Sequence, residues 1–268
     1  MRAPFTRFGL PQVIVYPLLV LVLMVVLFAV LIPVVKPVVW ILLIEVLFFL
    51  VFIWMLSFFR DPKRKIIGDE TVLYSPADGT ITDITPIDAG VPGITAALFS
   101  NAGKGEGARS TVTGQALRIG MFLSVFNVHI NRVPCSVRIE NVNYKKGQYK
   151  NAMSEEASRV NESNDITMLR LAEPYCRLLV RQISGAIARH IVCEGQVNDE
   201  YRQGEAFGMI KFGSRTELYI PVGNPGTPGS RPRVPGAESN ENLRTFEVKV
   251  KVGDKVRAGL TPLVRYCP

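Results

Sequence analysis

The hydrophobic pattern is most distinctive at the N-terminus, where two long apolar runs follow each other. Val13 to Val35 spans 23 residues with only two prolines as interruptions, and Val38 to Phe59 spans 22 residues with one acid, Glu45. A helix rises 1.5 Å per residue, so each run would be about 33 Å long, enough to cross a hydrocarbon core of roughly 30 Å. The pattern predicts a membrane hairpin that turns at Lys36-Pro37.

Basic residues flank this hairpin on both sides. Arg2 and Arg7 precede it, and the basic residues that follow it are Arg60, Lys63, Arg64 and Lys65. Positive flanks face the cytoplasm, so we expect residues 1–65 to anchor the chain in the cell membrane and residues 66–268 to form a cytoplasmic domain. A hairpin that enters one leaflet and returns would leave that domain on the same side. The runs are too long for a cleavable signal peptide.

One residue of the hairpin is unexpected in lipid. A carboxylate is costly there, so Glu45 is expected to pair with Lys36 near the turn or to face a second copy of the hairpin. The sequence leaves both alternatives open.

The remainder of the chain alternates between apolar and polar residues in short segments, as half-buried β-strands do. In residues 246–252, for example, the even positions hold Phe or Val and the odd positions hold Glu or Lys. The other predicted strands are 71–75, 79–84, 117–124, 136–143, 177–184, 206–212 and 216–220. We expect a short helix from Ser154, a candidate N-cap, to Glu162. The glycine- and proline-rich stretches Pro86–Gln115 and Val222–Asn242 predict long loops.

Two similar turns indicate a more specific architecture. Gly204–Gly208 and Val252–Gly259 each form an acidic turn that enters a strand and ends at glycine, as at the corners of lipoyl-like barrel sandwiches. Lys255 lacks the surrounding sequence of a lysine that carries lipoyl or biotin, which disfavours a swinging-arm carrier. The sequence therefore predicts a mainly β (α+β) fold, a lipoyl-like barrel-sandwich β domain with a short helix, preceded by the hairpin.

Charge and cysteine usage narrow the possible partners. The net charge is +8, and the apolar runs favour an anionic membrane surface or a phosphate-bearing substrate as the acidic partner. No dense basic run is interleaved with aromatic residues, so no nucleic-acid partner is expected. The cysteines form no C-x-x-C pair and predict reduced structural thiols with no metal site; they are Cys135, Cys176, Cys193 and Cys267.

Three short segments carry residue types that could do chemistry. They are SPADG (75–79), FLSVFNVHINR (122–132) and FGSR (212–215). Each is weak alone, but together they supply Ser214, His129 and Asp78, the types of a nucleophile, its base and the group that orients the base. The chain has two histidines, and His190 lies in a largely apolar segment where a structural role is expected.

These segments resemble those of a known family, the phosphatidylserine decarboxylases in their short bacterial form. The similar stretches are SPADGTITDI (75–84), FLSVFNVHINRVPCS (122–136), KKGQYKNAMSEEASRVNES (145–163), QISGAIARHIVC (182–193) and GEAFGMIKFGSRTELYIP (204–221). The last is the most specific, because it contains the family's Gly-Ser self-cleavage site.

The resemblance implies a proenzyme that cuts itself between Gly213 and Ser214. Ser214 would attack the Gly213 carbonyl, with His129 as the base and Asp78 orienting it. Elimination and loss of ammonia would leave a covalent pyruvoyl cofactor at position 214, without any metal. The products would be a beta chain, residues 1–213, and an alpha chain, residues 214–268, which stay together as a heterodimer.

The resemblance also implies the reaction. The pyruvoyl group would form a Schiff base with the amine of phosphatidylserine and accept the electrons left when CO₂ departs, giving phosphatidylethanolamine. His129 is the expected proton donor. Longer family members carry a second histidine where this chain has Arg132, which leaves open whether one histidine serves both steps. Arg132, Lys211 and Arg215 are candidates for binding the phosphate, by proximity in sequence only.

Two alternatives stay open at this point. The enzyme could act on a related serine phospholipid. The chain could also be a membrane-tethered, lipoyl-like adaptor without activity, which would explain the hairpin and the turns but not the three segments together. A homo-oligomer is possible under either interpretation.

Overall fold

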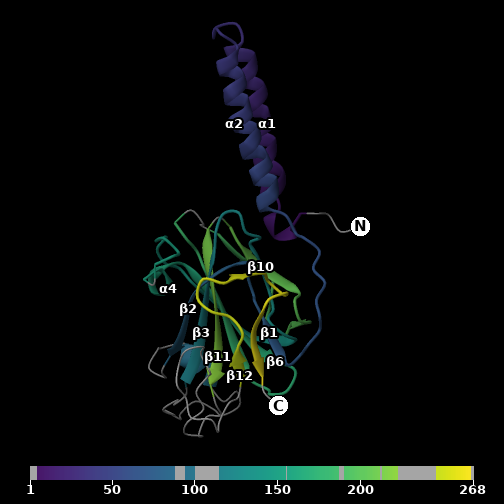
Figure 1. The fold of residues 1–268 in the computed structure, drawn as a ribbon, viewed down its shortest axis with the longest axis vertical. Coiled ribbons are helices and arrows are strands. Elements are labelled where there is room, and N and C mark those ends of the chain that lie inside the picture. The colour runs from purple at the N-terminus through teal and green to yellow at the C-terminus, as the bar shows by residue number, and fades with distance from the viewer. Residues whose placement is uncertain are drawn as a thin grey trace. The chain divides into compact units, whose positions relative to one another are not determined.

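A computed structural model describes residues 5–87, 94–99, 115–154, 156–186, 190–211, 213–222 and 246–266. The chain divides into two compact units, Met1–Lys63 and Arg64–Pro268. Figure 1 shows a helical hairpin and a β-rich domain.

The first unit is the helical hairpin. After a short 3-10 helix, η1 (Arg7–Gly9), come α1 (Gln12–Leu31) and α2 (Val39–Phe58), which pack side by side. Both helices are long and apolar enough to cross a membrane, and only 11% and 6% of the most apolar 18-residue segment of each helix is buried. Such unburied apolar faces suggest association with a membrane. No ion pair joins Glu45 to Lys36 among the described residues, and Glu45 Oε1 has no hydrogen-bond partner.

The second unit is built from strands with two short helices, α3 (Ile94–Phe99) and α4 (Ala157–Val160). The strands are β1 (Val72–Tyr74), β2 (Gly79–Ile87), β3 (Gln115–Leu123), β4 (Ile130–Arg132), β5 (Val137–Lys145), β6 (Ser163–Arg170), β7 (Arg177–Ile183), β8 (Ile191–Cys193), β9 (Glu200–Tyr201), β10 (Ala206–Ile210), β11 (Ser214–Val222), β12 (Phe246–Val248), β13 (Lys255–Val256) and β14 (Pro262–Tyr266). The mainly β class with two apolar N-terminal helices is confirmed. The lipoyl-like barrel sandwich stays a prediction.

One large sheet positions the site. Its eight strands run in the order β13-β2-β3-β11-β7-β6-β5-β9, and two three-stranded sheets, β1-β14-β12 and β4-β10-β8, complete the domain. β11 lies near the middle, antiparallel to β3 from Ser214↔Leu123 to Val222↔Gln115. Its Leu218 and Ile220 belong to the main hydrophobic core. Every residue of β11 except Pro221 is buried, so both faces of this strand are covered.

The structure corrects several local predictions. β6 was not predicted as a strand, because its sequence does not alternate between apolar and polar residues. The expected helix from Ser154 to Glu162 contracts to α4, although Ser154 Oγ accepts a 3.3 Å hydrogen bond from the Ala157 N–H. Helix α3 lies inside the predicted loop Pro86–Gln115. The predicted loop Val222–Asn242 lies outside the described residues from position 223 onward.

Candidate functional site

The candidate residues gather where several central strands begin or end. β3 ends at Leu123, β7 ends at Ile183 and β11 begins at Ser214. Ser214 is paired with Leu123, and Arg215 is paired with Ile183, so these three strand ends lie side by side. The loops that continue from them carry His129 and the Gly213–Ser214 peptide bond.

The peptide between Gly213 and Ser214 lies at a backbone bend. Gly213 has a φ of 64°, the left-handed region that glycine adopts without steric cost. Ser214 follows it directly as the first residue of β11, with 0% of its surface exposed. Among the described residues, the Ser214 hydroxyl has no hydrogen-bond partner. Buried polar atoms are nearly always paired, so an unpaired hydroxyl at this position is unusual.

His129 contacts the same bend. The imidazole is completely buried, its Nδ1 lies 2.9 Å from the main-chain carbonyl of Asn127, and its Nε2 lies 3.3 Å from the Gly213 nitrogen. A carbonyl oxygen can only accept and an amide N–H can only donate, so Nδ1 carries the proton and Nε2 is an acceptor. The ring is therefore neutral, with its basic nitrogen directed at the Gly213–Ser214 segment.

Local contacts hold the histidine in place. Asn127 Oδ1 accepts hydrogen bonds from the main chain and the hydroxyl of Ser124, at 2.9 and 2.8 Å, and so fixes the loop before His129. Two residues after His129, Asn131 donates to Thr216 Oγ1 at 3.0 Å and accepts from Gln182 Nε2 at 2.9 Å. Sequence reasoning missed this buried amide chain, which ties β4 to β11.

Asp78 has different partners from those expected. Its carboxylate accepts a 2.8 Å hydrogen bond from the Ala258 N–H and forms an ion pair with Arg64 at 2.7 Å. Both ring nitrogens of His129 are directed at main-chain groups, so the orienting role of Asp78 stays a prediction. Arg64 was expected only as a basic flank of the hairpin, yet its side chain is 4% exposed. No local sequence signal could have indicated this pair.

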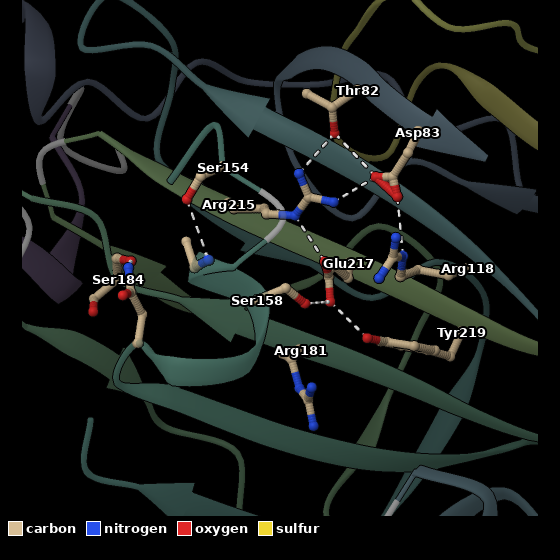
Figure 2. A network of polar contacts seen from close by, with 12 residues as sticks. Thr82, Asp83, Arg118, Ser154, Ser158, Arg181, Ser184, Arg215, Glu217 and Tyr219 are labelled. Carbon is tan, nitrogen blue, oxygen red and sulfur yellow. Dashed lines mark hydrogen bonds and ion pairs between the residues drawn. The ribbon is translucent and has the colours of Figure 1, made fainter. Parts of the chain in front are cut away.

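Behind the bend lies a buried polar network, shown in Figure 2. Arg215 donates to Glu217 at 2.7 Å, to Thr82 at 3.0 Å and to Asp83. Thr82 and Asp83 are neighbours on β2, and a register shift between Ile81 and Asp83 accompanies their shared contact with Arg215. The Arg215 side chain is only 3% exposed and fully committed to this network, so its proposed contact with a substrate phosphate is not supported.

The centre of the network is Glu217. Besides Arg215, its carboxylate accepts hydrogen bonds from Tyr219 at 2.6 Å and from Ser158 of α4 at 3.0 Å. Burial acts to raise the Glu217 pKa, but the charge of Arg215 and the hydrogen bond from Tyr219 outweigh it, so the pKa lies below its ordinary value. Burial and the charge of Glu217 raise the Tyr219 pKa. Glu217 is thus a buried anion at neutral pH.

The remaining candidates lie around this centre. Lys211 is buried, which lowers its pKa, and its main-chain N–H donates to the His190 carbonyl at 3.2 Å. The His190 side chain is exposed, so it is not a packed core residue, and its only described contact here is through the main chain. Arg132 donates to the Gly204 carbonyl at 3.0 Å.

The described cysteines are free thiols and do not form a metal site. Cys135 is buried, and burial raises its pKa, so it stays protonated. Cys176 and Cys193 are half-buried free thiols whose pKa values burial also raises. Within the described ranges no group of three or more His, Cys, Asp and Glu could hold a metal ion. Cys267 lies outside the described residues.

These features define a mainly β domain with a buried serine and a neutral histidine at a glycine bend. Comparison with known proteins agrees with this picture: residues 51–263 match the model of the family described as phosphatidylserine decarboxylase. The chain therefore belongs to the phosphatidylserine decarboxylase family.

Individual relatives share most of the chain. A phosphatidylserine decarboxylase proenzyme of Rhodopirellula baltica is 36% identical over 98% of this chain and 88% of its own length. Proenzymes of the same name from Carboxydothermus hydrogenoformans and Pelagibacter ubique are 34% and 35% identical. The first alignment covers 82% of this chain and 83% of the relative, and the second covers 80% of each.

Proposed function

We propose that this chain is a phosphatidylserine decarboxylase that activates itself by cutting the bond between Gly213 and Ser214. The observation that carries the proposal is the Ser214 hydroxyl, which is fully buried without a partner beside a glycine at φ 64°. His129, whose basic nitrogen accepts from the Gly213 N–H, is the only imidazole among the described contacts of this bend.

The first step is a shift of the acyl group from nitrogen to oxygen. Ser214 Oγ attacks the Gly213 carbonyl carbon, a C–O bond forms, and the bond from that carbon to the Ser214 nitrogen breaks. His129 takes the hydroxyl proton and delivers it to the leaving nitrogen, so the step is an isomerisation. Nε2 must first exchange the Gly213 N–H for the Ser214 hydroxyl. Asp78 would orient the histidine and stabilise its protonated form.

The second step separates the chains. His129, neutral again after the first step, takes the Ser214 α-proton as the bond between Ser214 Cβ and the ester oxygen breaks, which frees the Gly213 carboxylate and leaves dehydroalanine. Tautomerisation to an imine and attack by water then release ammonia and give a pyruvoyl group at position 214. The chains would be residues 1–213 and 214–268, and the antiparallel pairing of β11 with β3 and β7 would hold them together as a heterodimer.

The residues around position 214 fit such a group. The site is buried, adjoins a neutral imidazole and holds no charged side chain in contact with the Ser214 hydroxyl among the described residues. A pyruvoyl group there would supply an electrophilic carbonyl that takes up the electron pair left by CO₂. His129 would then deliver a proton to the substrate carbon, which yields phosphatidylethanolamine.

The hairpin fits a lipid substrate. We propose that α1 and α2 anchor residues 1–65 in the cell membrane and that residues 66–268 form the catalytic domain on the cytoplasmic side, because basic residues flank both helices. The corner turns at Gly204 and Gly253, both at positive φ, are compatible with a lipoyl-like barrel sandwich. Protease added to sealed right-side-out vesicles should leave the domain intact, and its digestion would reverse the orientation.

Intact-mass analysis of the purified full chain tests the central proposal. Residues 214–268 are 55 of 268, so a fragment of about 6 kDa, in proportion to the 29.7 kDa chain, should appear, with an N-terminus that resists Edman sequencing. The material should release CO₂ from phosphatidylserine vesicles. An active preparation that contains only the uncut chain would refute self-cleavage, and turnover of a related serine phospholipid alone would change the substrate.

A further inference from the structure

The carbonyl that Ser214 would attack rests against one particular residue. A Cβ atom added to Gly185 would overlap the carbonyl oxygen of Gly213 and would lie 3.3 Å from Ala152 Cβ. Gly185 is buried and is not among the glycines at positive φ, so a side chain is excluded there by space and not by backbone conformation. Glycine at 185 therefore makes room for the oxygen of the scissile peptide.

The residue before it faces Ser214 across the sheet. Arg215 pairs with Ile183, so continuing this antiparallel register by one residue brings Ser184 opposite Ser214. Directly opposite residues share a face, with Cβ atoms about 5 Å apart. The Ser184 main chain is fixed, because its N–H donates to Glu162 at 2.9 Å and its carbonyl accepts from Asn161 at 2.8 Å.

The hydroxyls of Ser184 and Ser214 share a second property. Both serines are 0% exposed, and among the described residues neither hydroxyl has a hydrogen-bond partner. Figure 2 shows Ser184 apart from the ion pairs of the buried network, with no hydrogen bond to Glu217 or Arg215. By register, the unpartnered Ser184 hydroxyl lies opposite Ser214, and the next residue, Gly185, adjoins the Gly213 carbonyl oxygen.

We propose that Ser184 and Gly185 form the oxyanion site for the Gly213 carbonyl during self-cleavage, an inference that rests on the proposed function. When Ser214 Oγ bonds to the Gly213 carbon, the carbonyl π electrons move to the oxygen. The Ser184 hydroxyl donates a hydrogen bond to this oxyanion and keeps its proton throughout. The carbonyl re-forms as the bond to the Ser214 nitrogen breaks, and Gly185 supplies only the space.

The Ser184 hydroxyl should affect the rate of self-cleavage but not the stability of the fold. Loss of one hydrogen-bond donor to an oxyanion slows comparable reactions about 100-fold or more, so Ser184→Ala should slow cutting about 100-fold. The same change removes a buried hydroxyl that has no partner, so the melting temperature should be unchanged or slightly higher. Ser184→Cys, a weaker donor of similar size, should cut at an intermediate rate, which a structural role would not produce.

Matched variants control for packing. Ser163→Ala removes a buried serine on β6, paired with Ile183 and one strand further from β11, and should cut at the wild-type rate. Gly185→Ala should block cutting. Gly208→Ala in β10 is the control for steric overlap, because its added Cβ would likewise overlap a main-chain oxygen, that of Val192. Since this overlap does not involve the Gly213 carbonyl, the Gly208→Ala variant should cut faster than Gly185→Ala.

The experiment is cell-free synthesis of the full chain with detergent or lipid, a pulse of labelled amino acid, and a time course on a denaturing gel. Slow cutting by Ser184→Ala at an unchanged melting temperature, with Ser163→Ala normal, is the expected result. If Ser184→Ala and Ser163→Ala both match the wild type, this inference fails while self-cleavage stands. If the wild type itself is never cut, the proposed function fails.

Discussion

The buried network around Glu217 permits a quantitative prediction, the effect of Glu217→Gln on stability. Three guanidinium groups and three carboxylates balance each other there, namely Arg118, Arg181, Arg215, Asp83, Asp165 and Glu217. The substitution keeps the shape of Glu217 but leaves one positive charge without a compensating negative charge. The site is buried, since the Glu217 side chain is 0% exposed. At least one of the donors from Arg215, Tyr219 and Ser158 also loses its acceptor.

Breaking a buried ion pair from one side costs about 3 to 5 kcal/mol. For a domain of this size each kcal/mol lowers the melting temperature by roughly 2 to 4 °C, so Glu217→Gln should lower it by roughly 6 to 20 °C. Removing both charges restores the balance, so the double variant Arg215→Met/Glu217→Gln should unfold at a higher temperature than Glu217→Gln alone. Measuring both in a Ser214→Ala background keeps every sample as one uncut chain.

The control is the same substitution at an exposed ion pair. Glu200 pairs with Arg138 at 2.8 Å, but the two side chains are 57% and 45% exposed, so Glu200→Gln should cost less than about 1 kcal/mol. Thermal unfolding followed by near-ultraviolet circular dichroism in detergent compares the variants. Equal shifts for Glu217→Gln and Glu200→Gln would refute the reasoning that the network is buried and balanced.

Four further outcomes are expected. Because the Glu217 pKa is depressed, its stabilisation is complete above its ordinary pKa of 4.5 and is lost as the pH falls through the folded value, so melting curves of wild type and Glu217→Gln should converge only in acid. Ser214→Ala should give one uncut, inactive chain by mass. His129→Ala should accumulate uncut chain on a gel, whereas exposed His190→Ala should cut normally. The full chain should sediment with membranes in high salt, because salt screens charge interactions but does not weaken the burial of apolar helices in lipid.

The local sequence pattern was enough to predict the long apolar helices and most of the longer strands. The apolar runs became α1 and α2, and strands such as β5 and β7 were expected within two residues of their ends. β6 was missed because its sequence does not alternate and begins with Ser163, Asn164 and Asp165, polar residue types that are typical of turns. Helix α3 was missed because its six residues lie in a glycine-rich stretch that predicts a loop.

The site shows the same division between local and long-range information. Ser214, Gly213 and His129 carry recognisable sequence motifs, and the structure brings the histidine to 3.3 Å from the Gly213 nitrogen. The partners of Asp78 could not be predicted, since Ala258 is 180 positions away and Arg64 belongs to a basic run. Arg215 was one of three phosphate-binding candidates by proximity in sequence, but an arginine on a strand covered on both sides must be neutralised inside the protein.

The position of β11 explains why a cut at its first residue need not dismantle the domain. The strand lies between β3 and β7, with register pairs along nine residues on one side and five on the other. Cutting between Gly213 and Ser214 removes one peptide bond and none of these pairs. Arg215, the next residue, is fixed by Glu217, Thr82 and Asp83. A group created at position 214 would therefore stay beside His129, because the buried charges that stabilise the uncut chain also hold the new chain end.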